Sequence, residues 1–193
     1  MIRRIIFLLT LSLSAPAFSL DLTGHWVLEK SEISYTVTHP LHVVHGKSIS
    51  ARGKGVCYSG HGDFHLGVLV KSFDSGDSNR DLHMLEVTRA GLYPLIDVKA
   101  RVTDAGGKQV PGELTADVTI QFAGKTKEYP KVKLRVEDMK DGTAHITGTL
   151  PLTLKDFDIT PPSLLTMPVK DEVPVKLDTR WRCGPAKADS TQK

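Results

Sequence analysis

The sequence is short of aromatic residues and lacks the common catalytic motifs. Aromatic residues make up 6% of the 193 positions, which does not favour a large aromatic-stacked pocket. The sequence has no nucleophile-elbow pattern, no Gly-rich phosphate loop and no His-Glu-x-x-His pair. Its basic residues form no clustered stripe of the kind that binds nucleic acid. These shortages disfavour an enzyme and a nucleic-acid-binding protein.

The N-terminal residues have the pattern of a secretory signal peptide. Two arginines at positions 3 and 4 precede an apolar run at 5–13, which is too short to cross a bilayer stably. A small-x-small site ends at Ser19, and we expect cleavage after this residue. The sequence therefore predicts export of the chain, with the periplasm as its expected location.

The mature chain is nearly neutral and long enough for one domain. Removal of residues 1–19 takes away two arginines and leaves 23 basic against 22 acidic residues. We find no repeat, linker or change of composition that indicates a second domain. Residues 20–183 are therefore expected to form a single domain. A polar tail at 184–193 is expected to be disordered.

Only two cysteines, Cys57 and Cys183, are present. In an exported chain with two cysteines, a disulfide is the default expectation. This bond would tie the second strand to the C-terminal end of the last strand. A free pair and a pair of thiolate ligands are the alternatives that the sequence leaves open.

Period-two alternation of apolar and polar residues dominates the mature chain. Ile33, Tyr35 and Val37 alternate with polar neighbours, and similar runs follow. Alternation of this kind is typical of antiparallel strands with one buried face. The expected strands cover residues 33–38, 64–71, 96–102, 113–122, 131–137, 144–152 and 173–181, with a weaker, Gly-broken strand at 48–54.

Turn signals and one helical pattern separate these strands. Gly-containing segments at 105–107, 122–125 and 140–142 are typical of connections between antiparallel strands. A helical pattern covers residues 78–90, with Ser78 as the candidate N-cap and Leu82, Leu85 and Ala90 as candidate core residues. Some eight strands and one short helix predict an all-β protein. Periodicity leaves both a closed antiparallel barrel and a two-sheet sandwich open.

Several stretches resemble the signatures of the YceI-like polyisoprenoid-binding family. The central stretch is Ser72-Phe-Asp-Ser-Gly76, followed by Arg80-Asp-Leu-His83 and then Tyr93-Pro94. The family's last motif is split here, because Gly112-Glu-Leu-Thr and Gly124-Lys-Thr-Lys stand farther apart than in the general pattern. The other stretches that resemble the family are Trp26–Ser31, Ile33–His39 and Val44–Gly46.

The resemblance implies a lipocalin-like, eight-stranded antiparallel β-barrel with an elongated apolar pore. In this family the pore takes a polyisoprenoid chain, such as a polyprenyl lipid or the tail of an isoprenoid quinone. Such a chain has few hydrogen-bonding groups, so its site needs apolar walls of matching shape. Each buried CH₂ unit contributes about 0.8 kcal/mol, so a long tail can bind without a sharp sequence motif. The resemblance thus implies a lipid-binding protein, not an enzyme, with no cofactor beyond the bound lipid or quinone.

The inward-facing apolar residues of the strands are the expected lining of this pore. Inward strand positions are apolar in an ordinary core as well, so the pattern alone does not separate lining from core packing. The expected ligand-binding residues are Tyr35, Val37, Phe64, Leu66, Val98, Val118, Ile120, Val132, Leu134, Ile146 and Leu150.

A charged turn at residues 74–83 has two interpretations. Arg80, Asp81 and His83 can meet a polar lipid head group at the pore mouth. The same residues can instead form a hydrogen-bonded turn in which Arg80 contacts a carboxylate. The expected partner is an isoprenoid lipid, and transient membrane contact and a homodimer are left open.

A metal site is the alternative function. His39, His42 and His45 lie within seven residues, and imidazole is a common ligand of zinc, copper and nickel. On one continuous strand, residues 39 and 45 would share a face and residue 42 would point away. This spacing does not specify a coordination geometry, so solvent-exposed or hydrogen-bonded histidines remain the competing interpretation.

Overall fold

The computed structural model describes residues 23–58, 60–103, 111–164 and 166–184. The predicted signal peptide at 1–19 and the expected turn at 105–107 lie outside the described residues. So does the predicted tail, apart from Gly184, which the structure places at the end of the last strand.

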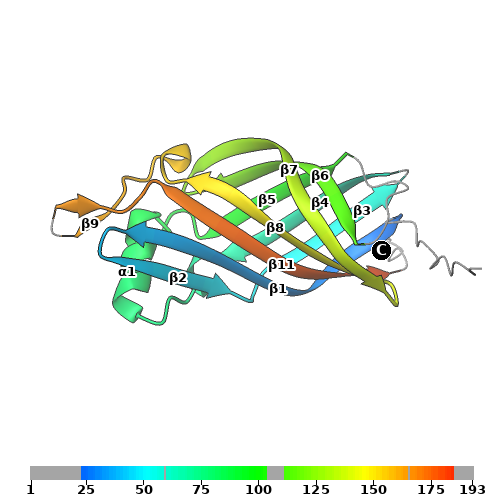
Figure 1. Ribbon diagram of the computed structural model, residues 1–193, viewed down its shortest axis with the longest axis horizontal. Helices are drawn as coiled ribbons and strands as arrows, with labels where there is room; N and C mark the ends of the chain where they lie inside the picture. The colour runs from blue at the N-terminus through cyan, green and yellow to red at the C-terminus, as the bar shows by residue number, and fades with distance from the viewer. Residues whose placement is uncertain (1–22, 59, 104–110, 165, 185–193) are drawn as a thin grey trace, which may run out of the picture.

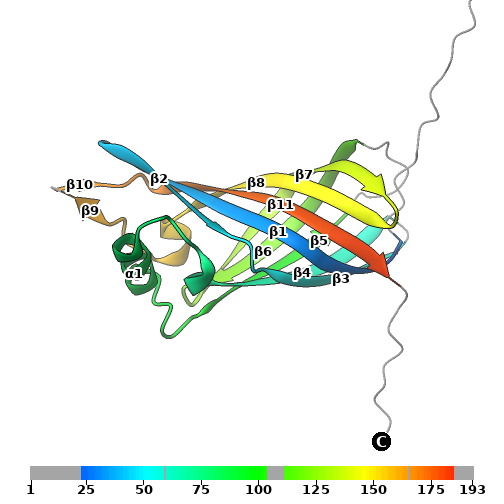
Figure 2. The same cartoon turned by 90° about the horizontal axis from the view of Figure 1, so that it is seen from below.

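Eight antiparallel strands close into a barrel, as the family resemblance implies (Figures 1 and 2). The last strand pairs with the first along a register that runs from His25–Gly184 to Tyr35–Val175. This pairing excludes an open two-sheet sandwich. Around the barrel the order is β1 (Gly24–His39), β3 (Arg52–Tyr58), β4 (His61–Leu69), β5 (Leu95–Val102), β6 (Gly112–Phe122), β7 (Lys125–Lys140), β8 (Thr143–Thr153) and β11 (Glu172–Gly184).

The strand β2 (His42–Ser48) extends the wall beyond the closed ring. It pairs with the C-terminal half of β1, from Ile33–Ser48 to His39–His42, whereas β3 pairs with the N-terminal residues 24–27 of β1. The strand predicted at 48–54 is therefore misplaced, because residues 49–51 are a break between two strands. Besides its pairing with β1, the strand β2 makes one isolated bridge to Asp74, which lies outside the strands. In this bridge Lys47 and Asp74 exchange backbone hydrogen bonds of 3.0 and 2.9 Å.

The short elements gather at one end of the barrel, at the left of Figure 1. We call this the mouth end and define it as residues 39–42, 69–95, 122–125, 153–164 and 166–172, where strands connect or terminate. The opposite end is the far end. The mouth end contains η1 (Val70–Ser72), α1 (Ser78–Val87), η2 (Lys155–Phe157) and a small hairpin of β9 (Ser163–Leu164) and β10 (Met167–Pro168).

The helix α1 is capped by Asp77 and not by Ser78 as predicted. One carboxylate oxygen of Asp77 accepts hydrogen bonds from the backbone N–H groups of Asn79 (2.9 Å) and Arg80 (3.1 Å). Both bonds hold the pKa of the Asp77 carboxyl group below its usual value, and the bond from Arg80 has the larger effect. Of the predicted core residues, Ala90 is buried, but Leu82 is 59% exposed. No helix of the described residues is long and apolar enough to span a membrane.

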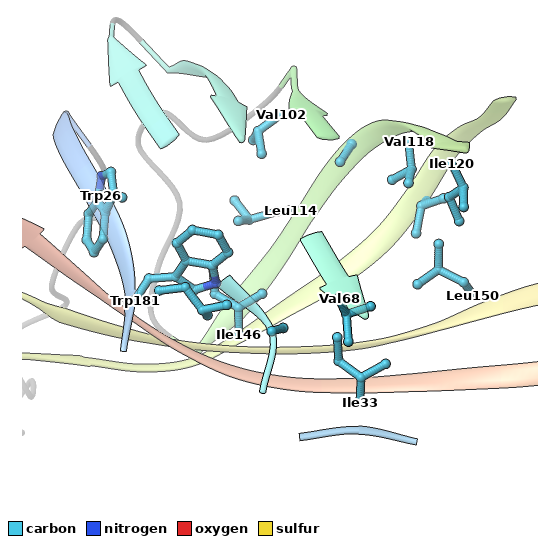
Figure 3. Packing of buried hydrophobic residues seen from close by; sticks show 14 of the residues in the cluster. Trp26, Ile33, Val68, Val102, Leu114, Val118, Ile120, Ile146, Leu150 and Trp181 are labelled. Atoms are coloured by element: carbon cyan, nitrogen blue, oxygen red, sulfur yellow. The ribbon is translucent and has the colours of Figure 1, made fainter. Parts of the chain in front are cut away.

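The core fills the barrel with the apolar side chains of alternate strand positions. Figure 3 shows Leu114, Val118 and Ile120 of β6 reaching inward, as Ile146 and Leu150 of β8 do. Toward the far end, the Trp181 ring packs edge-on against Phe64 with ring centroids 5.3 Å apart. The Trp181 indole N–H also donates to the buried Thr179 hydroxyl at 3.1 Å. These contacts fill the interior toward the far end.

The predicted disulfide is wrong for this fold, since no disulfide joins Cys57 and Cys183. The two cysteines lie on β3 and β11, and β1 runs between these strands, with Gly24 opposite Cys57 and Trp26 opposite Cys183. Two strand spacings amount to about 10 Å, whereas a disulfide requires Cα atoms within about 7 Å. The Cys57 thiol instead donates to the carbonyl oxygen of His61 at 2.9 Å.

Candidate functional site

The barrel encloses an apolar cavity of about 590 Å³. Its wall runs from Trp181 and Thr179 in the barrel interior to His39, His42 and Arg80 at the mouth end. The volume lies within the range of about 300–1,000 Å³ that is typical of small-molecule sites. Such a space suits a ligand with a long apolar part.

Ten of the eleven residues predicted to line the pore lie in the wall of this cavity. They come from β1, β4, β5, β6, β7 and β8, so most of the barrel circumference contributes. Their placement does not by itself test ligand binding, which stays a prediction. The ten are Tyr35, Val37, Phe64, Leu66, Val98, Val118, Ile120, Leu134, Ile146 and Leu150.

Val132 is buried but does not line the cavity. β7 has a bulge directly before Val132: Val118 pairs with Tyr129 and Ala116 with Val132, so β7 carries one extra residue at this point. Lys131 in the bulge has a positive φ of 55°, and its N–H donates to the Asp117 carboxylate at 2.9 Å. Val132 lies on the same face of β7 as Leu134, and it packs within the core cluster opposite Ala116.

Several wall residues were not identified from the sequence. The sequence shows the alternating pattern of β11, but its residues were not included in the predicted lining. This strand supplies Val173, Val175 and Leu177 to the wall. The residues outside the strands had no comparable signal, because their direction depends on how the mouth-end segments pack. This second group consists of Val70, Phe73, Met84, Val87, Leu154, Phe157 and Ile159.

Tyr35 forms the side of the cavity next to β2. Its ring lies over Gly46, which is its cross-strand partner, and its centroid is 5.7 Å from that of Phe73. A Cβ atom at Gly46 would lie 2.4 Å from a ring carbon of Tyr35, so only glycine leaves room for the ring. Burial raises the pKa of the Tyr35 hydroxyl, and the negative charge of Asp81 raises it further. Tyr35 is therefore a neutral, positioned wall residue near the mouth.

Replacing Gly46 with alanine is expected to destabilise the protein by about 1–3 kcal/mol, the usual cost of overpacking. The added methyl group must push the Tyr35 ring away from β2. Urea unfolding measures this cost. Gly91→Ala is the matched control, because a Cβ atom there meets no heavy atom within 4 Å. Equal unfolding midpoints for the two variants would show that the Tyr35 ring is not held against Gly46.

The charged turn divides its residues between the cavity mouth and the local structure. Arg80 and His83 line the cavity, whereas Asp81 does not. The Asp81 carboxylate accepts a hydrogen bond of 3.1 Å from the Ser75 N–H and so holds the loop before α1. The Arg80 guanidinium donates to the Ser75 carbonyl oxygen at 3.0 Å, and its side chain stays 46% exposed. The head-group interpretation thus fits Arg80 and His83, and the interpretation as a hydrogen-bonded turn fits Asp81.

The structure does not bring the three candidate metal ligands together. A turn at residues 40–41 makes His39 and His42 cross-strand partners, with ring centroids 4.9 Å apart, and both line the cavity. His45 instead pairs through Nδ1 with the Thr36 hydroxyl at 3.0 Å. The expectation that residues 39 and 45 share a face is therefore wrong. Among the described residues, no three His, Cys, Asp or Glu side chains are placed to hold a metal ion.

His39 has a structural role at the mouth. Its Nδ1 accepts a hydrogen bond from the Leu41 N–H at 3.2 Å, which places the ring proton on Nε2. Nε2 then donates to the Met167 carbonyl oxygen at 3.0 Å. The Lys170 N–H adds a bond of 2.8 Å to the Thr38 carbonyl oxygen. These contacts fasten the β1–β2 hairpin to the segment that carries β9 and β10.

A closed antiparallel barrel around an apolar cavity is a lipocalin-like architecture. The family model of the YceI-like domain matches residues 26–181, and the chain belongs to this family. No curated protein matches the chain significantly in sequence.

Two solved structures show the same fold. One is a polyisoprenoid binding domain from Saccharophagus degradans implicated in plant cell wall breakdown, with 13% identity, a TM-score of 0.68, and coverage of 82% of this chain and 98% of that chain. The other is BcnA of Burkholderia cenocepacia, with 20% identity, a TM-score of 0.66, and coverage of 78% of this chain and 95% of that chain. At these identities the likeness concerns the fold.

Proposed function

We propose that this chain is a periplasmic binding protein that stores or transports an isoprenoid lipid. The ligand would be a polyprenyl chain or an isoprenoid quinone, and the chain would perform no chemistry on it. The observation that carries the proposal is the cavity of about 590 Å³, whose wall consists mainly of apolar side chains. Membership of the YceI-like family supports it. So does the fold shared with a domain described as polyisoprenoid binding.

The barrel would bind the tail by removing it from water. Each CH₂ unit that leaves water contributes about 0.8 kcal/mol, and a preformed wall limits the entropy lost on binding. The wall carries methyl and methylene groups from strands that are hydrogen-bonded to neighbours on both sides, such as β5 and β6. Affinity would then depend on length and shape of the tail more than on any single polar contact.

The head group would lie at the mouth end, next to Arg80 and His83. The Arg80 side chain is partly exposed, and it can donate hydrogen bonds to a phosphate or carbonyl oxygen as well as to Ser75. His83 lines the same part of the cavity and lies 3.5 Å from the Glu86 carboxylate. These groups would orient the lipid with its tail inward.

The periplasmic location rests on residues 1–19, whose sequence is typical of a cleaved signal peptide. Intact-mass measurement of protein recovered from a bacterial periplasm tests it. The expected mature chain begins at Leu20. A full-length mass, or recovery only from the cytoplasm, would contradict both cleavage and location.

The ligand is tested by extracting the purified mature protein with organic solvent and analysing the extract by mass spectrometry. We expect a prenyl lipid or isoprenoid quinone in near-stoichiometric amount, because a ligand in a closed apolar site dissociates slowly. Metal content is measured on the same sample. An extract without prenyl compounds would overturn the proposal, and stoichiometric metal in that sample would favour the histidine alternative.

A further inference from the structure

Four large apolar side chains at or beside the mouth end are more than half exposed. Leu41 is 61% exposed at the tip of the β1–β2 hairpin, and Val43 is 52% exposed on β2. Leu82 on α1 is 59% exposed, and Leu92 in the connection from α1 to β5 is 76% exposed. We call these four residues the apolar rim. They come from three segments that surround one end of the barrel (Figures 1 and 2).

The rim residues stand on segments that are held in place. The turn that carries Leu92 is closed by its own N–H, which donates to the Arg89 carbonyl oxygen at 2.9 Å. The Arg89 side chain in turn donates to the carbonyl oxygens of Ala123 and Phe157. The Leu41 N–H is bound to His39, which is itself tied to Met167. The exposure therefore does not come from a loose chain end.

Two of the rim residues, Leu41 and Leu82, are next to residues of the cavity wall along the chain. On the β1–β2 hairpin, the exposed Leu41 directly precedes His42, which lines the cavity, whereas the exposed Val43 points to the opposite face of β2. On α1, His83 and Met84 line the cavity directly after the exposed Leu82. A surface that covered Leu41 and Leu82 would therefore lie beside the cavity wall at the mouth end. Large apolar side chains that are exposed together at one end of a protein are candidate interaction sites.

The charges at the mouth end do not form a cationic patch that would draw the protein to an anionic surface. Lys127 pairs with Asp156 at 2.7 Å, Lys125 with Asp158, and Lys155 with Asp171 at 3.8 Å. Each pair cancels charge locally. Docking through this end would accordingly depend on burial of apolar side chains.

We propose that the mouth end docks on the surface of a lipid bilayer by inserting the apolar rim among the lipid head groups. Apolar side chains gain free energy in the head-group and acyl boundary, and the gain scales with the apolar area buried. The cavity entrance would then face the membrane, and a tail could pass between bilayer and barrel without crossing water. The inference rests on the proposed function, because it assumes that the cargo is a membrane lipid.

Vesicle flotation tests the docking. The mature protein is mixed with vesicles of phosphatidylcholine alone, or of phosphatidylcholine with phosphatidylglycerol, at low and at high salt. We expect flotation with both compositions and little effect of salt. The rim variant Leu41→Gln/Leu82→Gln/Leu92→Gln is expected to bind about tenfold more weakly.

The control variant removes as many exposed apolar side chains away from the mouth end: Val27→Gln/Ile49→Gln/Tyr58→Gln. It is expected to float as the parent chain does, with melting temperatures used to confirm that both variants are folded. Docking is overturned if the parent chain does not float, if the two variants float equally, or if binding requires phosphatidylglycerol and disappears at high salt.

Uptake of farnesol from solution separates this inference from the proposed function. Farnesol uptake without flotation overturns the docking and leaves the isoprenoid-binding function standing. Flotation with neither farnesol uptake nor an extracted prenyl lipid overturns the isoprenoid-binding function and leaves the docking standing. The rim variant should take up farnesol as the parent chain does, because its substitutions lie outside the cavity wall.

Discussion

A Val98→Trp variant is expected to fold as the parent chain does and to lose most of its bound prenyl lipid. Val98 lies at the middle of β5, between Leu66 of β4 and Ile120 of β6, and all three line the cavity. An indole at this position occupies space that the tail would otherwise fill. Displacing only two methylene contacts costs about 1.6 kcal/mol, which corresponds to more than tenfold in affinity. The measurement is the amount of prenyl lipid extracted per mole of purified protein.

The control for this variant is Val27→Trp. Val27 points outward from β1 and is 57% exposed, so the same side chain there adds bulk without entering the barrel. Its lipid content should equal that of the parent chain. If Val98→Trp folds and keeps its full lipid content, the ligand does not occupy the barrel interior, and the assignment of the wall residues is wrong.

A Val136→Asp variant is expected to be largely unfolded at neutral pH. Val136 has 0% exposure, and it pairs with Gly112 and with the buried Ile146. Burial of a carboxyl group raises its pKa by up to about 3–5 units, which amounts to about 4–7 kcal/mol when the group must ionise. The whole free energy of unfolding of a domain is about 5–15 kcal/mol.

The same substitution predicts a pH dependence of known sign. The carboxyl pKa in the folded state lies above its unfolded value of about 3.9, so the folded state binds the proton more tightly. The ionisation penalty is absent below about pH 4 and grows as the pH rises toward the folded-state pKa. Relative to the parent chain, the variant should therefore be less destabilised at pH 4 than at pH 7 in urea unfolding.

Thr149→Asp is the matched control on the outer face. Thr149 is exposed on β8 opposite Lys176, so a carboxylate there meets water and a lysine. Its stability relative to the parent chain should not fall as the pH rises from 4 to 7. A Val136→Asp variant that unfolded at the same urea concentration as Thr149→Asp would mean that the interior beside β7 is not dry.

The strand pattern predicted the barrel wall well because a straight strand repeats every two residues. Phe64, Leu66 and Val98 lie on uninterrupted strands, and alternation alone places them inward. The prediction failed where the repeat is interrupted. The bulge at Lys131 breaks the alternation of β7, and the part of this strand before the bulge was not predicted. The break at 49–51 divides a predicted strand into the ends of two real ones. Both interruptions depend on pairing with a partner strand.

The mouth end was less predictable because its side chains are oriented by tertiary contacts. The helical pattern of 78–90 pointed Leu82 to the core, yet α1 turns Met84 and Val87 toward the cavity. The loop held by Asp77 and Asp81 sets that orientation. The disulfide prediction failed for a related reason, since the position of β1 between Cys57 and Cys183 follows from the circular strand order. The order of the strands around the barrel cannot be predicted from amino-acid composition or from the spacing of the cysteines.

The pairing of the first strand with the last also governs how the chain reaches its native state. Tyr35 and Val175 are neighbours across β1 and β11 although 140 positions separate them along the chain. Contacts between such distant residues require closure of a long loop before they stabilise anything, so folding is slow compared with that of local structures. Until β11 is in place, β1 and β8 each present an open edge and the apolar interior faces water. The nascent chain is therefore prone to aggregate until its C-terminal segment is complete, and a protein truncated before β11 should need a chaperone to stay in solution.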